Sequence, residues 1–335
     1  MPTEAPLLTI AIPTYNRSRY LRRLLDSLRP QLEEEENRKF CIELLISDNA
    51  SPDGTPALLE GYRHSGLVFR SLRNASNIGA DGNFVQCFTE ASGRYVWIVG
   101  DDDIILAGGL AVVLGLLVQD EYDILHLNAR TIDSNEETRK NPRHRRVEII
   151  EDARKFALRT HVYLTFITGN IINKERVMSL RPQPFSELIG TNLVQLGWTF
   201  TALRYFRKGA YVRDPIIAGG DEDRGGYELF KVFGTNLKRI TETWLVEPAM
   251  VRIVLNGTIQ KFFPHFVLRA RLGEETFHEE NRYEDLLHSL FSDRYRYYFF
   301  LYPILRLPIA LARQWLLLCR IINRLDKEIG DPLLR

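Results

Sequence analysis

The chain has 335 residues, which is enough for two domains or for one large domain with an appendage. Hydrophobic residues make up 45% and charged residues 26%, which excludes a collagen-like, disulfide-rich or disordered chain. The 44 Lys and Arg residues nearly balance the 43 Asp and Glu residues, for a formal net charge of +1. This balance argues against a dedicated nucleic-acid-binding protein, and we expect no nucleic-acid partner.

The cysteines and the N-terminus indicate where the protein works. Cys41, Cys87 and Cys319 lie far apart and form neither a CxxC pair nor a metal-ligand spacing, so we expect reduced thiols. The start, MPTEAPLLTIAIPTYNR, has no basic region and only a short apolar run, so we expect no secretion signal. Together these features predict a cytoplasmic protein.

The first 130 residues alternate apolar runs with segments of helical period, which predicts βα units around a mostly parallel sheet. Residues 7–12 form an almost uninterrupted apolar run, as expected of a strand buried on both faces. A helix follows, and Ser18 can cap its first turn. The later elements expected here are strands at 42–47, 67–72, 95–99 and 123–127, and a helix at 81–91.

A polar cluster follows each of the first four expected strands. The clusters begin at Pro13, Asp48, Arg73 and Gly100. Because the carboxyl ends of parallel strands meet at the edge of an α/β sheet where ligands bind, the four clusters predict a ligand site at that edge.

Three consecutive aspartates, Asp101, Asp102 and Asp103, close the fourth strand. Like charges this close repel one another, so something must offset them. One alternative is a solvated loop whose first aspartate caps the next helix. The other is a hard divalent cation, held by one or two carboxylates and completed by water and phosphate oxygens. At the end of a buried strand we favour the cation, Mg²⁺ or Mn²⁺, which would neutralise the charge on a departing diphosphate.

Two common phosphate-binding motifs are missing from the first strand–helix turn. Neither a Walker lysine loop nor a GxGxxG fingerprint occurs there. Phosphoryl transfer by a P-loop and dinucleotide redox chemistry are therefore disfavoured.

Four motifs occur in order in the first part of the chain: IPTYNR at 12–17, SDNASPDGT at 47–55, NASNIGADGNF at 74–84 and YVWIVGDDDII at 95–105. In order and spacing, residues 7–130 strongly resemble family 2 glycosyltransferases of the GT-A fold. The resemblance is greatest to the abequosyltransferase-like branch of bacterial surface-polysaccharide synthesis. It weakens over residues 150–220 and is slight over the last hundred.

This resemblance implies the fold class and the domain organisation. We expect an α/β protein with a Rossmann-like, mostly parallel GT-A sheet and a C-terminal helical extension. The catalytic domain would cover residues 1–226, with a nucleotide-sugar-binding half at 1–130 and an acceptor-side half at 131–226. A helical region would follow at 227–335.

The resemblance also implies a donor-nucleotide site. Pro13, Thr14 and Tyr15 would border the nucleotide base, and Asp48 would accept a hydrogen bond from it. Asn77 and Gly79 would shape the floor near the ribose. Each of these residues taken alone could equally end a strand or form a turn.

The aspartate cluster departs from the commoner family pattern, Asp-x-Asp, because Gly100 replaces its first carboxylate. The resemblance then implies that Asp101 neighbours the ribose or the diphosphate and that Asp102 is the principal metal ligand. Asp103 is a weaker candidate for a metal ligand and could instead support or cap the site.

Sugar transfer with inversion needs a base that takes the proton of the acceptor hydroxyl. The Glu-Asp pair usual in the family is absent, and the only acid between Arg176 and Arg213 is Glu187. Glu187 is our candidate base, although a carboxylate that interacts with a helix N-terminus is an equal alternative. Further candidates are Asp221, Glu222, Asp223 and His161, the last more typical of a structural histidine.

The segment 294–329 is rich in aromatic and aliphatic residues but carries Arg306 and Arg313, which argue against a membrane-spanning helix. With Arg320 and Lys327 these arginines recur every seven residues and predict a basic stripe on an amphipathic helix. Such a helix could lie in a membrane interface, or it could pack on the catalytic domain or on a second subunit.

The sequence thus predicts an inverting, metal-dependent glycosyltransferase that uses a nucleoside-diphosphate sugar and a hydroxyl of a bacterial surface glycan. The acceptor would be lipid-linked, met at the inner face of the cytoplasmic membrane. Residues 139–146 and 219–226 would contact the acceptor or close over the donor.

Two rival functions remain open. A non-catalytic scaffold or sensor for nucleotide sugars would explain the missing Glu-Asp pair. A sugar-nucleotide pyrophosphorylase should carry a Gly-rich basic loop after the first strand, where this chain has Pro13-Thr14-Tyr15-Asn16-Arg17.

Overall fold

The computed structural model describes residues 5–131, 146–219, 227–273 and 282–328. The predicted loops at 139–146 and 219–226 fall outside these ranges except for Arg146 and Gly219. The chain divides into two compact units. The first comprises Met1–Asp152, Leu164–Gly190 and Val194–Asp223, and the second comprises Ala153–Tyr163, Thr191–Leu193 and Arg224–Arg335.

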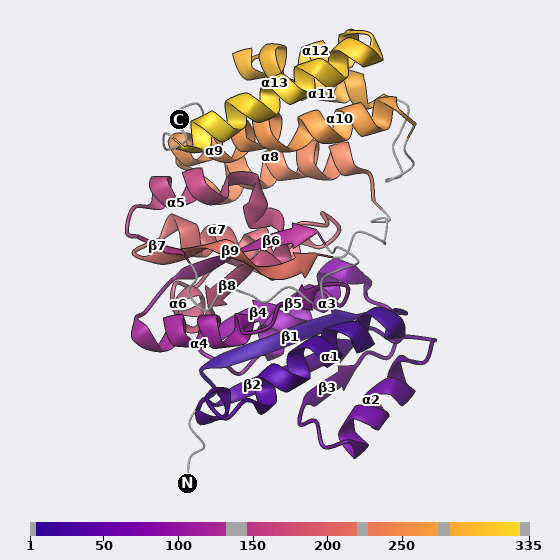
Figure 1. The fold of residues 1–335 in the computed structure, drawn as a ribbon, viewed down its shortest axis with the longest axis vertical. Coiled ribbons are helices and arrows are strands. Elements are labelled where there is room, and N and C mark those ends of the chain that lie inside the picture. The colour runs from indigo at the N-terminus through magenta and orange to yellow at the C-terminus, as the bar shows by residue number, and fades with distance from the viewer. Residues whose placement is uncertain (1–4, 132–145, 220–226, 274–281, 329–335) are drawn as a thin grey trace. The chain divides into compact units, whose positions relative to one another are not determined.

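The first unit is built around a sheet of nine strands with the order β3-β2-β1-β4-β8-β6-β9-β5, and β7 pairs with β9 (Figure 1). The neighbours β3, β2, β1 and β4 are parallel, whereas β8 runs antiparallel to β4 and β6. The predicted α/β fold with its parallel N-terminal half is confirmed. The strands are β1 (Leu8–Thr14), β2 (Ile42–Asp48), β3 (Arg70–Arg73), β4 (Tyr95–Ile98), β5 (Ile104–Ile105), β6 (Ile124–Thr131), β7 (Val147–Ile150), β8 (Asn170–Asn173) and β9 (Gly209–Gly219).

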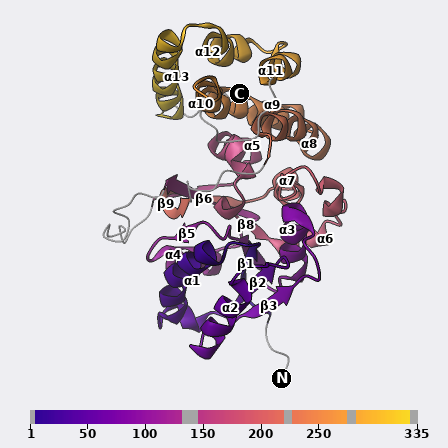
Figure 2. The same ribbon diagram turned by 90° about the vertical axis from the view of Figure 1, so that its right-hand side faces the viewer.

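Helices cover both faces of this sheet (Figure 2). In that view α1 and α4 lie on one side of the strands, and α3 and α6 lie on the other. The helices of the unit are α1 (Ser18–Glu33), η1 (Asn37–Lys39), α2 (Thr55–His64), α3 (Gly79–Glu90), α4 (Gly109–Gln119), η4 (Ile167–Gly169), α6 (Lys174–Ser179), η5 (Phe185–Leu188) and α7 (Leu196–Arg204).

The core of the first unit explains why β1 is apolar along its whole length. Every residue of β1 is buried, because the strand has a neighbour on each side and helices over both faces. Leu8, Ile10 and Ile12 belong to the same buried cluster as the apolar face of α1. That face repeats at three- and four-residue steps, through Leu21, Leu24, Leu25 and Leu28.

Two predicted boundaries differ from the structure. Ser18 is the first residue of α1 rather than its cap, and the carboxylate Oδ2 of Asp53 accepts a hydrogen bond from its N–H at 2.9 Å. The third strand begins at Arg70 rather than at 67, because the N–H of Leu67 donates to Tyr62 O and closes the end of α2. In both cases a hydrogen bond that the local sequence pattern does not predict determines where the element begins.

The second unit is helical, as predicted from Tyr227 onward. None of the described helices is long and apolar enough to cross a membrane. Its elements are α5 (Ala153–Thr160), η6 (Lys231–Asn236), α8 (Leu237–Ile240), η7 (Thr241–Leu245), α9 (Pro248–Gly257), η8 (Thr258–Phe262), α10 (Phe263–Arg271), α11 (Tyr283–Phe291), η9 (Tyr297–Leu301), α12 (Tyr302–Arg306) and α13 (Ile309–Glu328), while η3 (His161–Thr165) crosses the boundary between the units.

Candidate functional site

The carboxyl ends of the parallel strands bring the predicted donor residues to one edge of the sheet. Thr14 at the end of β1 pairs with Asp48 at the end of β2, and Asp48 pairs with Arg73 at the end of β3. The N–H of Val99 donates to Ala11 O at 2.9 Å, which places the end of β4 beside β1. The edge predicted from the four polar clusters therefore forms.

Asp101 is buried and hydrogen-bonded to two residues. Thr14 is the last residue of β1, and Arg17 follows that strand. The Oδ2 of Asp101 accepts a hydrogen bond from Thr14 Oγ1 at 2.6 Å, and its Oδ1 accepts one from an Arg17 guanidinium nitrogen at 3.0 Å. Burial raises the pKa of Asp101 to about 6, although the charge of Arg17 and the Thr14 hydrogen bond act in the opposite direction. The carboxyl group is thus fixed by the strand end and cannot reorient without losing both partners.

Replacing Thr14 by valine should lower the free energy of unfolding by about 1–3 kcal/mol, because a buried carboxylate oxygen loses its donor. Urea denaturation measures the change. Thr14→Ser keeps the hydroxyl group and is the matched control, so it should cost less. Equal stability of the valine and serine variants would contradict the assigned hydrogen bond.

Asp102 and Asp103 each place one carboxylate oxygen close to Gly100. A Cβ atom added to Gly100 would lie 3.1 Å from Asp102 Oδ1 and also 3.1 Å from Asp103 Oδ2. Thr168 Oγ1 donates to Asp103 Oδ2 and accepts from the N–H of Gly100, which fixes this arrangement. A side chain at position 100 would therefore crowd both carboxylates.

This donor set fits a hard divalent cation. Mg²⁺ is usually bound by one or two carboxylates, with water and phosphate oxygens in its other positions. The Asp102 side chain is 27% exposed, so a ligand can approach it from solvent. No group of three or more His, Cys, Asp or Glu side chains in the described ranges could hold a metal ion.

Arg17 is a site residue that the sequence reasoning missed. One guanidinium nitrogen lies 3.0 Å from Asp101 Oδ1 and 3.4 Å from Asp102 Oδ2. This cation offsets part of the repulsion that the aspartate run creates. Its position at the end of the IPTYNR motif was the available signal.

Asp48 is buried at the predicted position but already has partners for both oxygens. Its Oδ1 accepts from the N–H of Ser51 at 2.8 Å, and its Oδ2 forms an ion pair with Arg73. Each carboxylate oxygen can accept a second hydrogen bond. Contact between Asp48 and a nucleotide base therefore stays a prediction.

Asn49, which was not singled out from the sequence, holds the loop before α3. Its Nδ2 donates to Asn77 Oδ1 at 2.8 Å, and its Oδ1 accepts from the N–H of Ile78 at 3.0 Å. Asn77 Oδ1 also accepts from the N–H of Gly79, whose φ of 80° suits glycine. Asn77 and Gly79 thus shape this loop, and their place at the floor near the ribose stays a prediction.

Pro13 is buried in β1, whereas Tyr15 is 40% exposed just beyond the strand. An exposed ring at this edge is available to contact a flat base, and the place predicted for Tyr15 beside the nucleotide base stays a prediction. No ligand contact of either residue is shown.

The candidate base Glu187 lies in η5 and is exposed. The helix is anchored by Phe185, which packs edge-on against Phe88 and Trp198. Nothing in the geometry selects Glu187 for proton transfer, so the role stays a prediction.

The alternative bases are placed differently. His161 is buried in the second unit beside Gly257, where an added Cβ would lie 2.6 Å from His161 Cβ. This packing favours the structural role considered for His161. Asp221, Glu222 and Asp223 lie outside the described residues.

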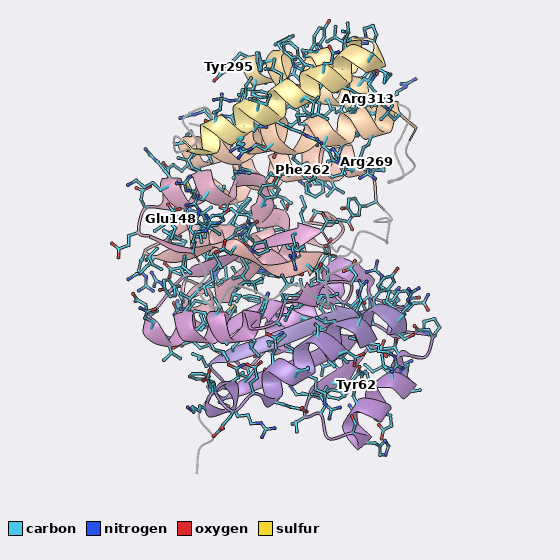
Figure 3. The ribbon with its side chains drawn as sticks, in the orientation of Figure 1. Tyr62, Glu148, Phe262, Arg269, Tyr295 and Arg313 are labelled. Atoms are coloured by element: carbon cyan, nitrogen blue, oxygen red, sulfur yellow. The ribbon has the colours of Figure 1, made fainter. Side chains whose placement is uncertain are left out.

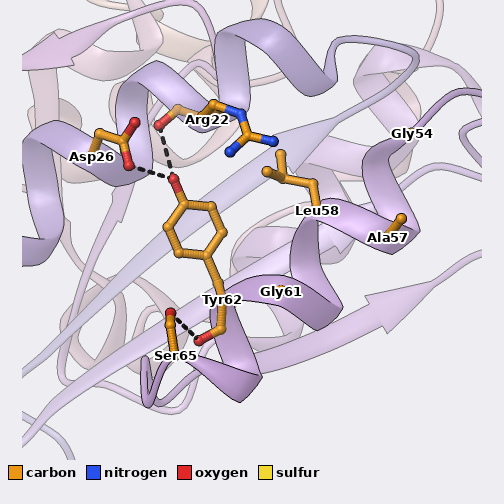
Figure 4. Close-up of a pocket in the computed structure, with 8 residues that line it drawn as sticks. All are labelled: Arg22, Asp26, Gly54, Ala57, Leu58, Gly61, Tyr62 and Ser65. Atoms are coloured by element: carbon orange, nitrogen blue, oxygen red, sulfur yellow. Dashed lines mark hydrogen bonds between the residues drawn. The ribbon is translucent and has the colours of Figure 1, made fainter.

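A cleft of about 440 Å³ lies between α1 and α2, and none of Asp101, Asp102 and Asp103 lines it (Figure 4). Tyr62 crosses it and donates a hydrogen bond to Asp26 Oδ1 at 2.5 Å, while burial raises the pKa of the Tyr62 hydroxyl. The remaining lining residues are Arg22, Gly54, Ala57, Leu58, Gly61 and Ser65. None of the predicted site residues lines this cleft.

Comparison with known proteins decides the family. The sequence pattern of glycosyl transferase family 2 matches residues 9–180, just over half of the chain. The chain belongs to glycosyl transferase family 2. Its predicted family is thereby confirmed, and this is a family of glycosyltransferase enzymes.

Relatives of this family 2 chain support the predicted branch. It is 40% identical over 110 residues to abequosyltransferase RfbV of Salmonella typhimurium, a match that covers 32% of this chain and 31% of the relative. The matched segment thus spans about a third of the curated relative.

Solved structures support the GT-A fold. S. aureus TarS 1-349 in complex with UDP-GlcNAc has a TM-score of 0.57 at 16% identity, with 96% of this chain and 92% of that chain covered. The mannosyltransferase PcManGT from Pyrobaculum calidifontis, in complex with GDP-Man and Mn²⁺, has a TM-score of 0.51 at 16% identity, with 97% and 89% covered. At these identities the likeness concerns the fold alone.

Proposed function

We propose that this protein transfers one sugar, with inversion, from a nucleoside-diphosphate donor to a hydroxyl group of a bacterial surface glycan. The observation that carries the proposal is the position of Asp102 Oδ1 and Asp103 Oδ2, both close to Gly100 just after the end of β4. Membership of family 2 and the abequosyltransferase relative support it.

The aspartates would hold Mg²⁺ or Mn²⁺, with Asp102 as the principal ligand and Asp103 as the second. A cation there supplies Lewis acidity to the departing diphosphate. The Mn²⁺ bound to the mannosyltransferase of similar fold is consistent with this part of the proposal.

The other site residues would bind and orient the donor. Thr14 and Arg17 keep Asp101 in place next to Asp102 and Asp103. There Asp101 would neighbour the ribose or diphosphate. Tyr15 and Asp48 would border the base. Fixed hydrogen bonds of this kind lower the entropy cost of placing the anomeric carbon for attack.

Glu187 would accept the proton of the acceptor hydroxyl as its oxygen attacks the anomeric carbon and the nucleoside diphosphate leaves from the opposite face. The acceptor would be lipid-linked and met at the inner face of the cytoplasmic membrane.

A thermal-shift screen of nucleotide sugars, with Mn²⁺ and with EDTA in its place, tests donor binding. Ligand at about one hundred times its dissociation constant stabilises a protein by about 2.7 kcal/mol, so the Tm should rise by several degrees for the correct donor with Mn²⁺. The rise should shrink in EDTA. A shift that is equal in both, or none with any donor, would contradict the proposed metal-dependent site.

Products formed without acceptor distinguish the rival functions. Slow release of free sugar and nucleoside diphosphate is expected of a transferase whose site admits water. Release of sugar phosphate and nucleoside triphosphate when pyrophosphate is added would instead support a pyrophosphorylase. Intact donor after prolonged incubation, both with and without pyrophosphate, would support a scaffold or sensor.

A further inference from the structure

Helix α13 of the second unit has an unusual distribution of side chains. Its buried side carries Ala312, Leu316, Cys319 and Asp326, and it packs against α10, α12 and η8. The opposite side is apolar apart from Gln314. Its exposed members, here called the leucine face, are Leu311 (47% exposed), Leu317 (56%), Leu318 (40%), Ile321 (58%) and Leu325 (55%).

Polar contacts on the buried side hold the leucine face outward. Gln260 Nε2 donates to Asn323 Oδ1 at 2.8 Å and to Asp326 Oδ2 at 3.2 Å, and Asn323 Nδ2 donates back to Gln260 O at 3.0 Å. Lys261 lies 3.8 Å from Asp326. The helix therefore buries Asp326 and exposes four of its five leucines, the reverse of what water around it would favour.

One edge of the leucine face is basic. Arg313, Arg320 and Arg324 are exposed and recur at steps of seven and four residues, which places them along one side of the helix. The only acidic residue between 309 and 326 is Asp326, which is buried. Lys327, the last member of the predicted stripe, has a side chain outside the described part.

The other edge is aromatic. Trp315 packs on Phe299 with ring centroids 5.4 Å apart, and its Nε1 donates to Phe299 O at 2.8 Å. On η9 and α12, Tyr298 and Tyr302 lie with ring centroids 5.7 Å apart and are 48% and 39% exposed. Tyr295, which is 70% exposed, and Arg313 both project outward from the second unit (Figure 3).

The apolar, basic and aromatic parts of this surface together indicate what kind of partner it contacts. Single exposed apolar residues are normal on a protein surface, but a continuous apolar face marks an interaction site. A face bordered by arginines on one edge fits a partner of opposite charge better than a second copy of itself. Leucines with a basic edge and aromatic side chains are typical of a helix that lies in the plane of a bilayer, its arginines near anionic headgroups.

We propose that α13 docks the protein on anionic lipid bilayers, with the leucine face among the acyl chains and Arg313, Arg320 and Arg324 at the phosphate level. A helix of 20 residues is about 30 Å long, and the leucine face runs along most of that length. Docking needs neither donor nor acceptor. It therefore goes beyond the proposed sugar transfer and is tested separately from it.

Sedimentation of the full chain with vesicles tests this surface. The protein should sediment with phosphatidylcholine vesicles that contain phosphatidylglycerol, and far less with phosphatidylcholine alone or at high salt. Leu317→Gln combined with Ile321→Gln should lower the partition coefficient by about tenfold. The control pair Val68→Gln and Val118→Gln alters exposed apolar residues of the first unit and should have no effect.

A second pair of variants tests the charge. Arg313→Gln with Arg320→Gln should lower binding to the anionic vesicles by about tenfold or more, since each basic residue near such a surface contributes about 1 kcal/mol. The control Arg38→Gln with Lys39→Gln removes the same charge from η1. The changed residues are arginines, leucine-face residues, Lys39 and the two control valines. Circular dichroism verifies that each variant folds.

Three results would overturn the proposal. The wild type could fail to sediment with anionic vesicles, or both α13 pairs could bind as well as the wild type. Sedimentation velocity without lipid could also reveal a dimer that Leu317→Gln with Ile321→Gln dissociates, in which case a second copy covers the leucine face.

Discussion

Replacing Asp102 by asparagine is expected to lower the rate of sugar transfer by about a hundred- to a thousandfold at saturating donor. The change removes the charge of the principal metal ligand, and loss of several kcal/mol of charge stabilisation corresponds to that factor. Asparagine has nearly the same shape, and Asp102 is only partly buried, so the Tm should change little. Initial rates with Mn²⁺ measure the effect.

Asp293→Asn is the matched control, because Asp293 is exposed in the second unit and the substitution removes the same charge. Its transfer rate should equal that of the wild type. If Asp102→Asn also keeps a near-normal rate and the same dependence on Mn²⁺, Asp102 is not the metal ligand.

Replacing Glu187 by glutamine is the second large effect we expect. If Glu187 is the base, kcat should fall by about a hundred- to ten-thousandfold, because general base catalysis contributes that much. Donor binding should be unchanged, since no predicted donor contact involves Glu187. Transfer at saturating donor gives kcat, and the thermal shift with donor gives binding.

Glu175→Gln controls for the loss of an exposed carboxylate in the same unit, since Glu175 lies in α6 with its side chain 75% exposed. Near-normal turnover by Glu187→Gln with intact donor binding would remove Glu187 from the role. Asp221, Glu222 and Asp223 would then be the next carboxylates to replace.

The elements that the sequence predicted well are those determined by local patterns. An apolar run that ends at turn-forming residues predicted β1, and leucines at three- and four-residue steps predicted α1. Parallel strands place their carboxyl ends at one edge, so the approximate location of the site followed from the strand order alone.

Contacts across long stretches of chain could not be predicted in this way. Arg17 and Asp101 are 84 residues apart, and Thr168 and Asp103 are 65 apart. Nothing in a local window pairs such residues, because their meeting depends on sheet order and on the packing of η4. The supporting partners of the aspartates therefore emerged only from the structure.

The C-terminal helix shows a similar limit. The seven-residue repeat indicated an arginine stripe, but it did not tell which apolar side would be buried. Contacts of Gln260 with Asn323 and Asp326 set the rotation of α13 and leave the leucine face outward. The break between α12 and α13, at Leu307 and Pro308, also places Arg306 on a separate helix.

The central claim is that Asp102 and Asp103, just after the end of β4, bind a divalent cation that also binds the diphosphate of the donor. A crystal structure with Mn²⁺ and the nucleoside diphosphate of the preferred donor tests it most directly, through the anomalous signal of manganese. We predict one peak that bonds to an Asp102 oxygen and to diphosphate oxygens beside Gly100. A diphosphate bound without manganese at Asp102, or a peak at another place, would contradict the account.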